Sequence, residues 1–333
     1  PAGFNALNQD NMVGTEQFQA AFSWIKNRDA ADNNMLFDRV RGATKDMHSN
    51  STAAEVTNVN TVQRFLEAGV QIGNDVEVNT ANESYVLWNF MAEATGSGTL
   101  NEVGSIDSTV LVDTTLGMSV GTFTGSGSNA TVGHGLGVAP EMVIVKSTTG
   151  TAQWATYHIG KGATAAMMLD DTTPGTVSAG YFNNTAPTSS VFSVGTSSYT
   201  NGTTTMMFVA FAPSQFISIG SYEGNGSATD GTFVPTLNSL GVPLQPIWTM
   251  TKNIDTTSDW AIFDAARDPY NVVGEILFAS DPGAEIASSK MDYVNGGIKM
   301  RSNSPYTNSA QTLIHLTIGT PIIDVDGRII AGR

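Results

Sequence analysis

Paired carboxylates are the residues of this chain best suited to acid–base catalysis. Asp170 and Asp171 are adjacent, and Asp264 and Asp268 lie four residues apart. A glycoside hydrolase needs two such carboxyl groups, one as an acid and one as a base or nucleophile. The chain has 30 acidic residues among 333, however, so pairs of this kind arise in it without a catalytic purpose. We therefore predict no catalytic role for these four residues.

An aspartate followed closely by an arginine recurs in the sequence. Asp38 precedes Arg41, and Asp264 precedes Arg267 at the equivalent place of a later segment, where the middle segment has His158. An aspartate that begins a turn accepts backbone N–H groups and attracts a nearby cation. The pattern predicts a structural ion pair or a turn cap.

Metal and nucleophile chemistry finds little support. Cysteine is absent, no serine stands in a nucleophile elbow, and the DVDG stretch at 324–327 lacks the later ligands of a calcium loop, so it indicates a hairpin turn. The four histidines stand at spacings unrelated to a metal site: His48, His134, His158 and His315. We expect no catalytic residue, no cofactor-binding residue, no metal site and no cofactor, and hence no enzyme.

Two glycine-rich stretches share their glycines and most of their serines: SVGTFTGSGS at 119–128 and SIGSYEGNGS at 218–227. A phosphate-binding loop joins a strand to a helix and carries a lysine at the helix start. Neither stretch is followed by a basic residue or a helical pattern. We predict instead the first strand and turn of a repeated unit, in which glycine permits a positive φ.

A fixed spacing recurs three times along the chain. An apolar alternating run ends in a lysine at Lys26, Lys146 and Lys252, and an aromatic residue follows eleven positions later at Phe37, Tyr157 and Phe263. Four residues after each aromatic stands a base, at Arg41, Lys161 and Arg267. Because internal repeats decide the reading of a whole fold, this spacing predicts three copies of one unit.

The chain then divides into units 1–93, 118–213 and 215–318, with a linker and possible edge strand at 94–117 and a C-terminal hairpin tail at 319–333. Short runs that alternate between apolar and polar residues, split by Gly, Asn and Asp, are typical of strands. The predicted fold is all-β: three tandem antiparallel β-sandwich units, jelly-roll-like, with little helix.

Local signals refine this picture. The segment at 15–42 favours a helix locally through its Gln, Ala and Glu residues, but alignment of the run at 22–26 with the other two units predicts a strand there. Short helical turns are expected near 34–41 and 266–272, and Asn201-Gly202 is a type I′ hairpin signal.

Aromatic and apolar residues of the repeat are expected in three cores, with the repeated lysines at strand ends. Trp154 and Trp260 are also expected in the core, although exposed tryptophans would suit stacking on sugars. The predicted core residues are Trp24, Ile25, Phe37, Val145, Tyr157, Trp248 and Phe263.

Charge and hydropathy exclude some partners. The net charge of −15 would repel a phosphate backbone, so we expect no nucleic-acid binding. No apolar run has the length of a membrane span.

The segments at 24–45, 218–236 and 260–273 resemble a repeat found in virion proteins of marine tailed phages, including phages of cyanobacteria. The resemblance implies a structural component of the virion, as a capsid decoration, tail fibre or other appendage, made in the host cytoplasm and assembled on the particle. Its partners would then be other virion proteins and copies of itself. The alternatives are an adhesin that binds host-surface polysaccharide and, less favoured, a glycan-degrading enzyme.

The first unit departs from the repeat because it lacks the glycine-rich opening. Either residues 4–22 form a variant first strand, or a neighbouring chain supplies that strand, since an unpaired strand edge is normally covered. We expect the second case, in a homo-oligomer or lattice, with the arm at 1–17 or the segment at 94–117 as the donated strand.

Overall fold

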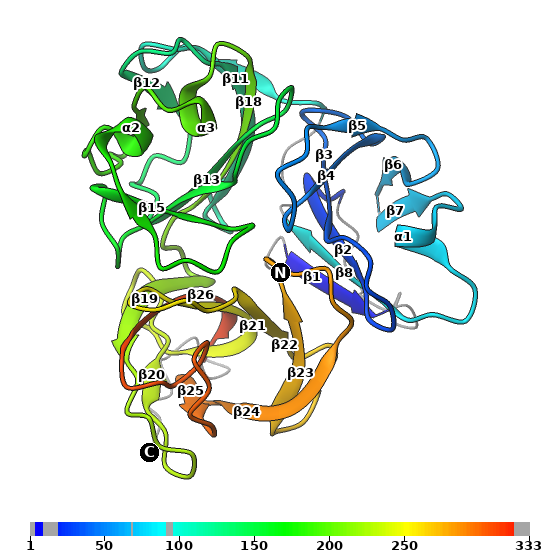
Figure 1. Cartoon of the computed structure of the whole chain (residues 1–333), viewed down its shortest axis with the longest axis vertical. Coiled ribbons are helices and arrows are strands. Elements are labelled where there is room, and N and C mark those ends of the chain that lie inside the picture. The colour runs from blue at the N-terminus through cyan, green and yellow to red at the C-terminus, as the bar shows by residue number, and fades with distance from the viewer. Residues whose placement is uncertain (1–3, 9–18, 68, 91–95, 323–333) are drawn as a thin grey trace.

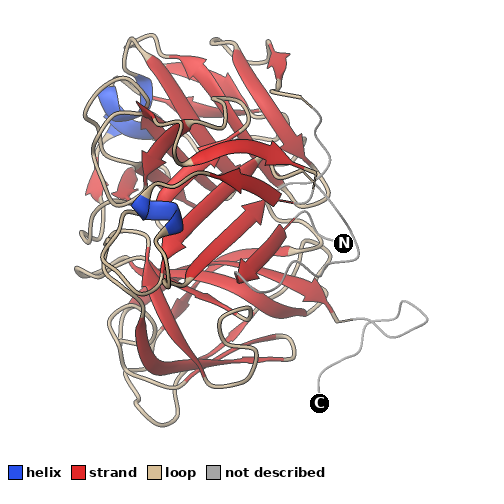
Figure 2. Cartoon of the chain, turned by 90° about the vertical axis from the view of Figure 1, so that its right-hand side faces the viewer, coloured by secondary structure: helices blue, strands red, loops and turns tan. Residues whose placement is uncertain are grey.

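The computed structural model describes residues 4–8, 19–67, 69–90 and 96–322 and is almost entirely β (Figures 1 and 2). Three antiparallel sheets, one from each predicted unit, are arranged around a common centre (Figure 1). The all-β prediction is thus confirmed. The three sheets share one hydrophobic core.

The main sheets have the same order of six strands. In unit 1 the order is β1-β8-β2-β3-β4-β5, and in units 2 and 3 it is β11-β18-β13-β14-β15-β16 and β19-β26-β21-β22-β23-β24. Unit 1 contains β1 (Phe4–Asn8), β2 (Phe22–Asn27), β3 (Met35–Asp38), β4 (Lys45–His48), β5 (Val56–Thr57), β6 (Val62–Leu66), β7 (Gly69–Ile72) and β8 (Tyr85–Phe90). The segment at 94–117 and unit 2 together contain β9 (Thr99–Asn101), β10 (Ser108–Asp113), β11 (Met118–Thr124), β12 (Ala130–Gly133), β13 (Met142–Ser147), β14 (Ala155–His158), β15 (Ala165–Met168), β16 (Thr176–Val177), β17 (Val191–Val194) and β18 (Thr205–Phe211). Unit 3 contains β19 (Ile217–Glu223), β20 (Phe233–Pro235), β21 (Leu244–Asn253), β22 (Ala261–Asp264), β23 (Val273–Phe278), β24 (Ile286–Val294), β25 (Gly297–Met300) and β26 (Thr312–Pro321).

The repeated aromatic residue occupies the same pairing position in all three sheets. Phe37 lies opposite Ser23, three residues before Lys26. The equivalent pairs are Val143 with Tyr157 and Thr249 with Phe263. The lysine-to-aromatic spacing in the sequence is therefore the register of one hairpin, used three times.

Unit 1 has its own first strand, so the expectation of a strand donated by a neighbour is wrong. The backbone of β1 pairs with β8, and Phe4 lies opposite Phe90. Met118 lies opposite Phe211 in the same position of unit 2. A strand needs only backbone N–H and C=O groups to pair, which is why β1 fits without the glycine-rich motif.

The segment at 94–117 contains β9 and β10, which extend the sheet of unit 2 next to β11. It therefore contributes to a sheet in its own chain. At the other end, β26 continues to Pro321, opposite Leu244. The rest of the predicted tail, with the DVDG turn at 324–327, lies outside the described residues.

Helix is limited, in the described part, to three elements of four residues: α1 (Val76–Asn79), α2 (Ala179–Phe182) and α3 (Ser198–Asn201). Near 34–41, β3 occupies four of the eight residues and a single turn follows, in which the Gly42 N–H donates to the Asp38 carbonyl oxygen. The loop after β22 has one such turn, from the Asp268 N–H to the Asp264 oxygen, and neither place has a helix. Asn201-Gly202 is also not a type I′ hairpin, because Asn201 ends α3. Ser197 caps that turn of helix by accepting the Tyr199 N–H, and this local bond outweighs the hairpin signal.

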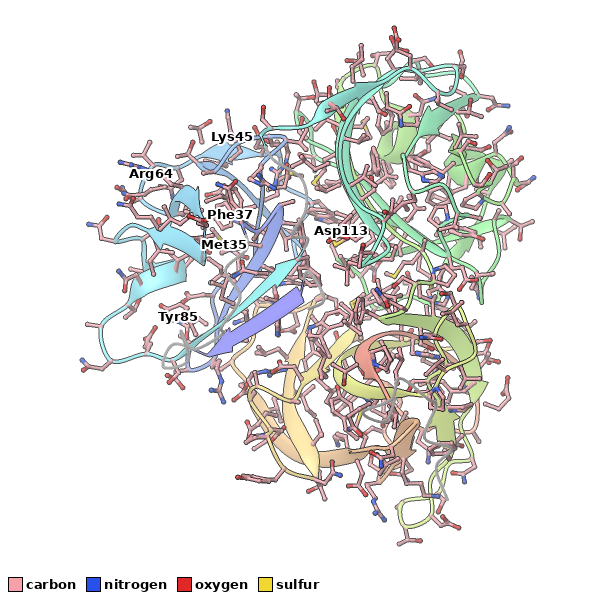
Figure 3. The ribbon with its side chains drawn as sticks, turned by 180° about the vertical axis from the view of Figure 1, so that it is seen from behind. Met35, Phe37, Lys45, Arg64, Tyr85 and Asp113 are labelled. Carbon is pink, nitrogen blue, oxygen red and sulfur yellow. The ribbon has the colours of Figure 1, made fainter. Side chains whose placement is uncertain are left out.

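Each main sheet is buried on both faces. One face contributes to a central core shared by all three units, which includes Trp24, Trp88, Trp154, Trp248 and Trp260. The other face has a separate core in each unit; in unit 1 this core includes Met35, Phe37 and Tyr85, seen from behind in Figure 3. All seven predicted core residues are buried, as are Trp154 and Trp260, but Trp24 and Trp248 belong to the shared core. Burial on both faces explains why strands such as β2 and β13 are buried at every position.

The glycines of the two matching stretches serve close backbone approach as well as turns. A side chain at Gly125 would meet the Gly202 carbonyl oxygen at 1.9 Å, and one at Gly224 would meet the Ser309 oxygen at 1.9 Å. Gly127 and Gly226, further along, have φ values of 71° and 66°. The stretches begin with β11 and β19, so the prediction of a strand and turn is confirmed.

Candidate functional site

The repeated polar residues lie at the contacts between neighbouring units, which we call seams. Lys26, Lys146 and Lys252 are fully buried next to the ends of β2, β13 and β21. Lys146 Nζ donates to the Thr52 carbonyl oxygen of unit 1 at 3.1 Å, and Lys252 Nζ donates to the Thr172 oxygen of unit 2 at 3.0 Å. Burial lowers the pKa of each of the three lysines to about 8. Two of the lysines therefore fasten one unit to the previous one.

A second set of contacts closes the arrangement into a ring. Trp154 Nε1 of unit 2 donates to the His48 carbonyl oxygen of unit 1 at 2.8 Å, and Trp260 Nε1 of unit 3 donates to the Met168 oxygen of unit 2 at 2.9 Å. Unit 1 has Asn34 at the equivalent position, and its Nδ2 donates to the Phe278 carbonyl oxygen of unit 3 at 3.0 Å. The first and third units are joined in this way.

The predicted ion pairs are present in units 1 and 3, and they are turn caps at the same time. Arg41 Nε donates to Asp38 at 2.5 Å, while the Arg41 N–H donates to the other oxygen of that carboxylate at 2.8 Å. Arg267 Nε donates to Asp264 at 2.6 Å, and its N–H donates at 2.9 Å. In both units the guanidinium also pairs with a glutamate of the following loop, Glu55 or Glu285.

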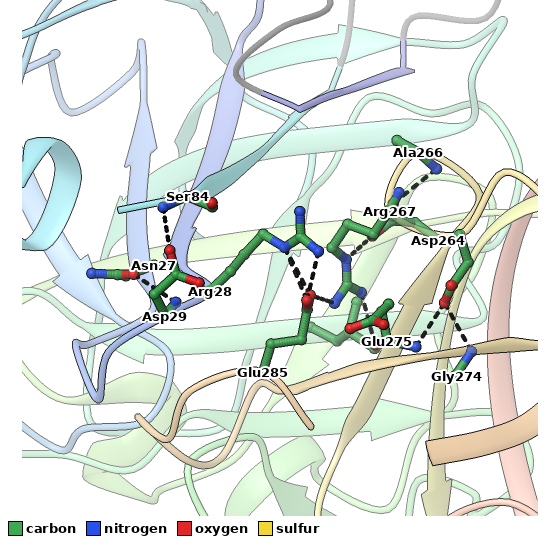
Figure 4. A network of polar contacts seen from close by, with 12 residues as sticks. Asn27, Arg28, Asp29, Ser84, Asp264, Ala266, Arg267, Gly274, Glu275 and Glu285 are labelled. Atoms are coloured by element: carbon green, nitrogen blue, oxygen red, sulfur yellow. Dashed lines mark hydrogen bonds and ion pairs between the residues drawn. The ribbon is translucent and has the colours of Figure 1, made fainter. Parts of the chain in front are cut away.

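At the seam between units 3 and 1 this pair grows into a network (Figure 4). Glu285 lies between Arg267, at 2.7 Å, and Arg28 of unit 1, at 2.6 Å. Trp88 Nε1 of unit 1 donates to the Asp264 carboxylate at 3.0 Å, and the Arg267 guanidinium lies 5.5 Å from the Trp88 ring centre. The side chains of Asp264 and Arg267 are completely buried.

A carboxyl pair lies at the edge of this network. Glu275 donates a hydrogen bond to the Glu285 carboxylate, and this bond, helped by burial, raises the pKa of Glu275 to about 7. The pKa of Glu285 is lowered despite its burial, because Arg28 and Arg267 stabilise its charge. The two carboxyl groups are in hydrogen-bond contact, whereas a glycoside hydrolase needs them about 5 Å or more apart. Glu275 and Glu285 share a proton in this arrangement, and Glu285 links unit 3 to unit 1 through Arg267 and Arg28.

Unit 2 uses a histidine and a lysine at the equivalent positions. His158 Nδ1 accepts the Gly160 N–H, so Nε2 carries the proton and donates to the His315 carbonyl oxygen of unit 3 at 3.3 Å. Lys161 Nζ donates to the Ile254 carbonyl oxygen of unit 3 at 2.7 Å. Burial lowers the pKa of His158 to about 3 and that of His315 to about 4, which keeps both rings neutral at pH 7.

The other carboxylates and histidines considered from the sequence are dispersed. Asp170 accepts the Trp154 N–H at 2.8 Å, and Asp268 accepts the Gly274 N–H at 2.8 Å. His134 Nε2 contacts the Thr188 carbonyl oxygen, and His48 lies 3.9 Å from Glu77. No cluster of three potential ligands for a metal ion occurs in the described ranges.

Sequence reasoning missed the residues that join the seams: Arg28, Glu285 and Glu275. Glu55 and Glu285 do occupy equivalent places, since Lys45 pairs with Thr57 as Glu275 pairs with Ala287. The repeat therefore carried a signal for these glutamates. The local sequence does not indicate which residue of another unit each one contacts, as Arg28 of unit 1 contacts Glu285 of unit 3.

These features define an all-β protein of three fused units with a common strand order. The chain belongs to the family described as a domain of unknown function, DUF7483, whose model matches residues 4–319. No curated protein and no solved structure matches the chain. In the part of the chain that the structure describes, no helix is long and apolar enough to cross a membrane.

Proposed function

We propose that this protein is a structural component of a tailed-phage virion, as a capsid decoration or a tail or fibre appendage, without enzymatic turnover. The observation that carries the structural role is the use of the repeated charged residues: each forms bonds within or between units. The resemblance of the segments at 24–45, 218–236 and 260–273 to phage virion repeats supports the location. At a finer level, we propose that each unit is a jelly-roll-like sandwich whose second layer is short, as in the hairpin β6–β7.

Self-association or contact with other virion proteins is part of this proposal. Five exposed apolar side chains fall within 21 residues of unit 1, on or next to β5, β6, β7 and α1, and we propose that they belong to such a contact surface. They are Val56, Val59, Leu66, Ile72 and Val76.

The test is the location of the protein. Purified particles should contain it in a fixed copy number by mass spectrometry, and an in situ particle map should contain its three-sheet ring. Absence from particles that are otherwise complete would refute the virion role.

The rival of a glycan-degrading enzyme is tested separately. The protein should release no reducing ends from host-surface polysaccharide. Release that is lost in Asp264→Asn, while the variant stays folded, would favour the enzyme.

A further inference from the structure

The loop between β22 and β23 of unit 3 is longer than the equivalent loops of the other two units. In unit 1 Met35 pairs with His48, and in unit 2 Ala155 pairs with Met168, in both cases thirteen residues further along. In unit 3 the equivalent partner of Ala261 is Phe278, seventeen residues further along. The hairpin from β22 to β23 therefore has four extra residues, and two units fold without them.

The longer loop is held firmly on two sides. Asp268 Oδ2 accepts the N–H groups of Gly274 at 2.8 Å and Glu275 at 2.6 Å. The Asn271 side chain donates to the Tyr293 carbonyl oxygen and accepts the Tyr293 N–H, both at 2.9 Å. Between these two anchors lies Tyr270, whose surface is 84% exposed. These anchors fix the backbone on both sides of Tyr270, so a loop that the other two units lack presents an aromatic ring to solvent, as binding loops on a rigid scaffold do.

Next to this ring lies a pocket of about 110 Å³. Its wall combines the loop with the start of β21 and with β24. In the described part of the chain the side chains of Gln245 and Tyr270 make no hydrogen bond, so both can bond a ligand. The lining residues are Gln245, Pro246, Ala265, Asp268, Pro269, Tyr270, Asn271, Val273 and Tyr293.

We propose that this pocket binds one ring of a neutral sugar at the surface of a glycan. The Tyr270 ring offers a flat apolar face for the C–H side of the sugar, and the Gln245 amide and Asp268 carboxylate can bond its hydroxyl groups. The volume is well below the roughly 300–1,000 Å³ of sites that enclose a drug-sized ligand, so the remainder of the glycan stays outside.

Charge selects among sugars. Asp268 lines the pocket, and the chain carries a net charge of −15. A uronic acid would bring a further carboxylate into this field, and like charges at close range repel. The site thus prefers neutral hexoses to anionic sugars.

The inference goes beyond the proposed virion role, and its test is independent of whether the protein is found on particles. The full-length protein is titrated with methyl glycosides of glucose, galactose, mannose and N-acetylglucosamine, and with the methyl glycoside of glucuronic acid, by calorimetry and saturation-transfer NMR. We expect at least one neutral glycoside to bind more tightly than the glucuronide.

Tyr270→Ala should weaken this binding at least about tenfold, the change that corresponds to losing about 1.4 kcal/mol of aromatic contact. Gln245→Ala should weaken it as well. Leu240→Ala is the matched control: Leu240 is 77% exposed in another loop of unit 3 and should leave binding unchanged. Because Tyr270 is largely in solvent, its variant should melt at the temperature of the native protein.

Three results would overturn the inference. They are no binding of any neutral glycoside at millimolar concentration, equal binding of the glucuronide, and a Tyr270→Ala variant that binds as the native protein does. In the third case, a Tyr270→Ala variant that has lost self-association would assign the loop to a contact between protein chains.

Discussion

The buried arginine of unit 3 offers the sharpest test of the seams. Arg267→Met keeps much of the volume of the side chain but removes a guanidinium that is 0% exposed. The variant loses bonds to Asp264, at 2.6 Å, to Glu285, at 2.7 Å, and to the Ile262 carbonyl oxygen, at 3.1 Å. It leaves the Asp264 carboxylate buried without its cation. Removing one partner of a buried ion pair costs about 3–5 kcal/mol of unfolding free energy, a large part of the roughly 5–15 kcal/mol that stabilises a typical domain.

The assay is urea unfolding followed by tryptophan fluorescence, since Trp88 lies against this guanidinium. Lys299→Met is the matched control, because Lys299 pairs with a largely exposed Asp230 and should cost less than about 1 kcal/mol. Combining Arg267→Met with Asp264→Asn should cost less than the sum of the two single changes, since the second change removes the stranded charge. A loss below about 1 kcal/mol for Arg267→Met alone would refute the view that this network holds the ring.

Three further predictions concern the core and the pH dependence of stability. Phe263→Ala should cost about 3–5 kcal/mol in denaturant melts, because Phe263 is fully buried; a loss below 1 kcal/mol would show that its burial contributes little. The folded-state pKa values of His158 and His315, about 3 and 4, lie below the usual 6.5, so the unfolded chain binds more protons and the stability falls as the pH drops below about 6.5. His158→Gln should therefore reduce the fall in melting temperature between pH 7 and pH 4. An unchanged dependence on pH would contradict this. The pKa of Glu275 is raised to about 7, so its contribution to the stability of the fold is fully present below about pH 4.5 and is lost as the pH rises through 7. Glu275→Gln should remove this loss, which is measured as the difference between the melting temperatures at pH 5 and pH 8. A difference equal to that of the native protein would argue against the shared proton.

The register of the three hairpins could be predicted from the sequence because it depends on local spacing. The eleven residues from Lys26 to Phe37 contain one strand end, one loop and one strand, and the same count in the other units gives the same pairing. Hydrophobic runs on both sides of this loop identify the buried strands without any knowledge of partners. The predicted core residues lie in or next to these buried strands, and for that reason they could be identified from the sequence.

The ring could not be predicted in this way. Trp154 donates to a carbonyl oxygen 106 positions earlier, and Arg28 pairs with a glutamate 257 positions later. A backbone oxygen as acceptor leaves no trace in the residue type that carries it, so no pattern in the sequence names it. The separate cores that we expected for Trp24 and Trp248 became one for the same reason: the sequence shows that a residue is apolar, and only the fold shows which face it covers.

Comparison of the three units distinguishes the features that the common fold requires from those that one unit has in addition. The buried lysine and the aromatic residue occur in every unit, at one register, so their bonds and packing belong to the common architecture. The four extra residues of the β22–β23 hairpin occur in one unit only, and the other two units show that the sheet closes without them. The fold does not need this segment, yet Asp268 and Asn271 anchor it so that it presents Tyr270 to solvent. A loop of this kind can bind a ligand without disturbing the sheets, which is why we place the binding site there.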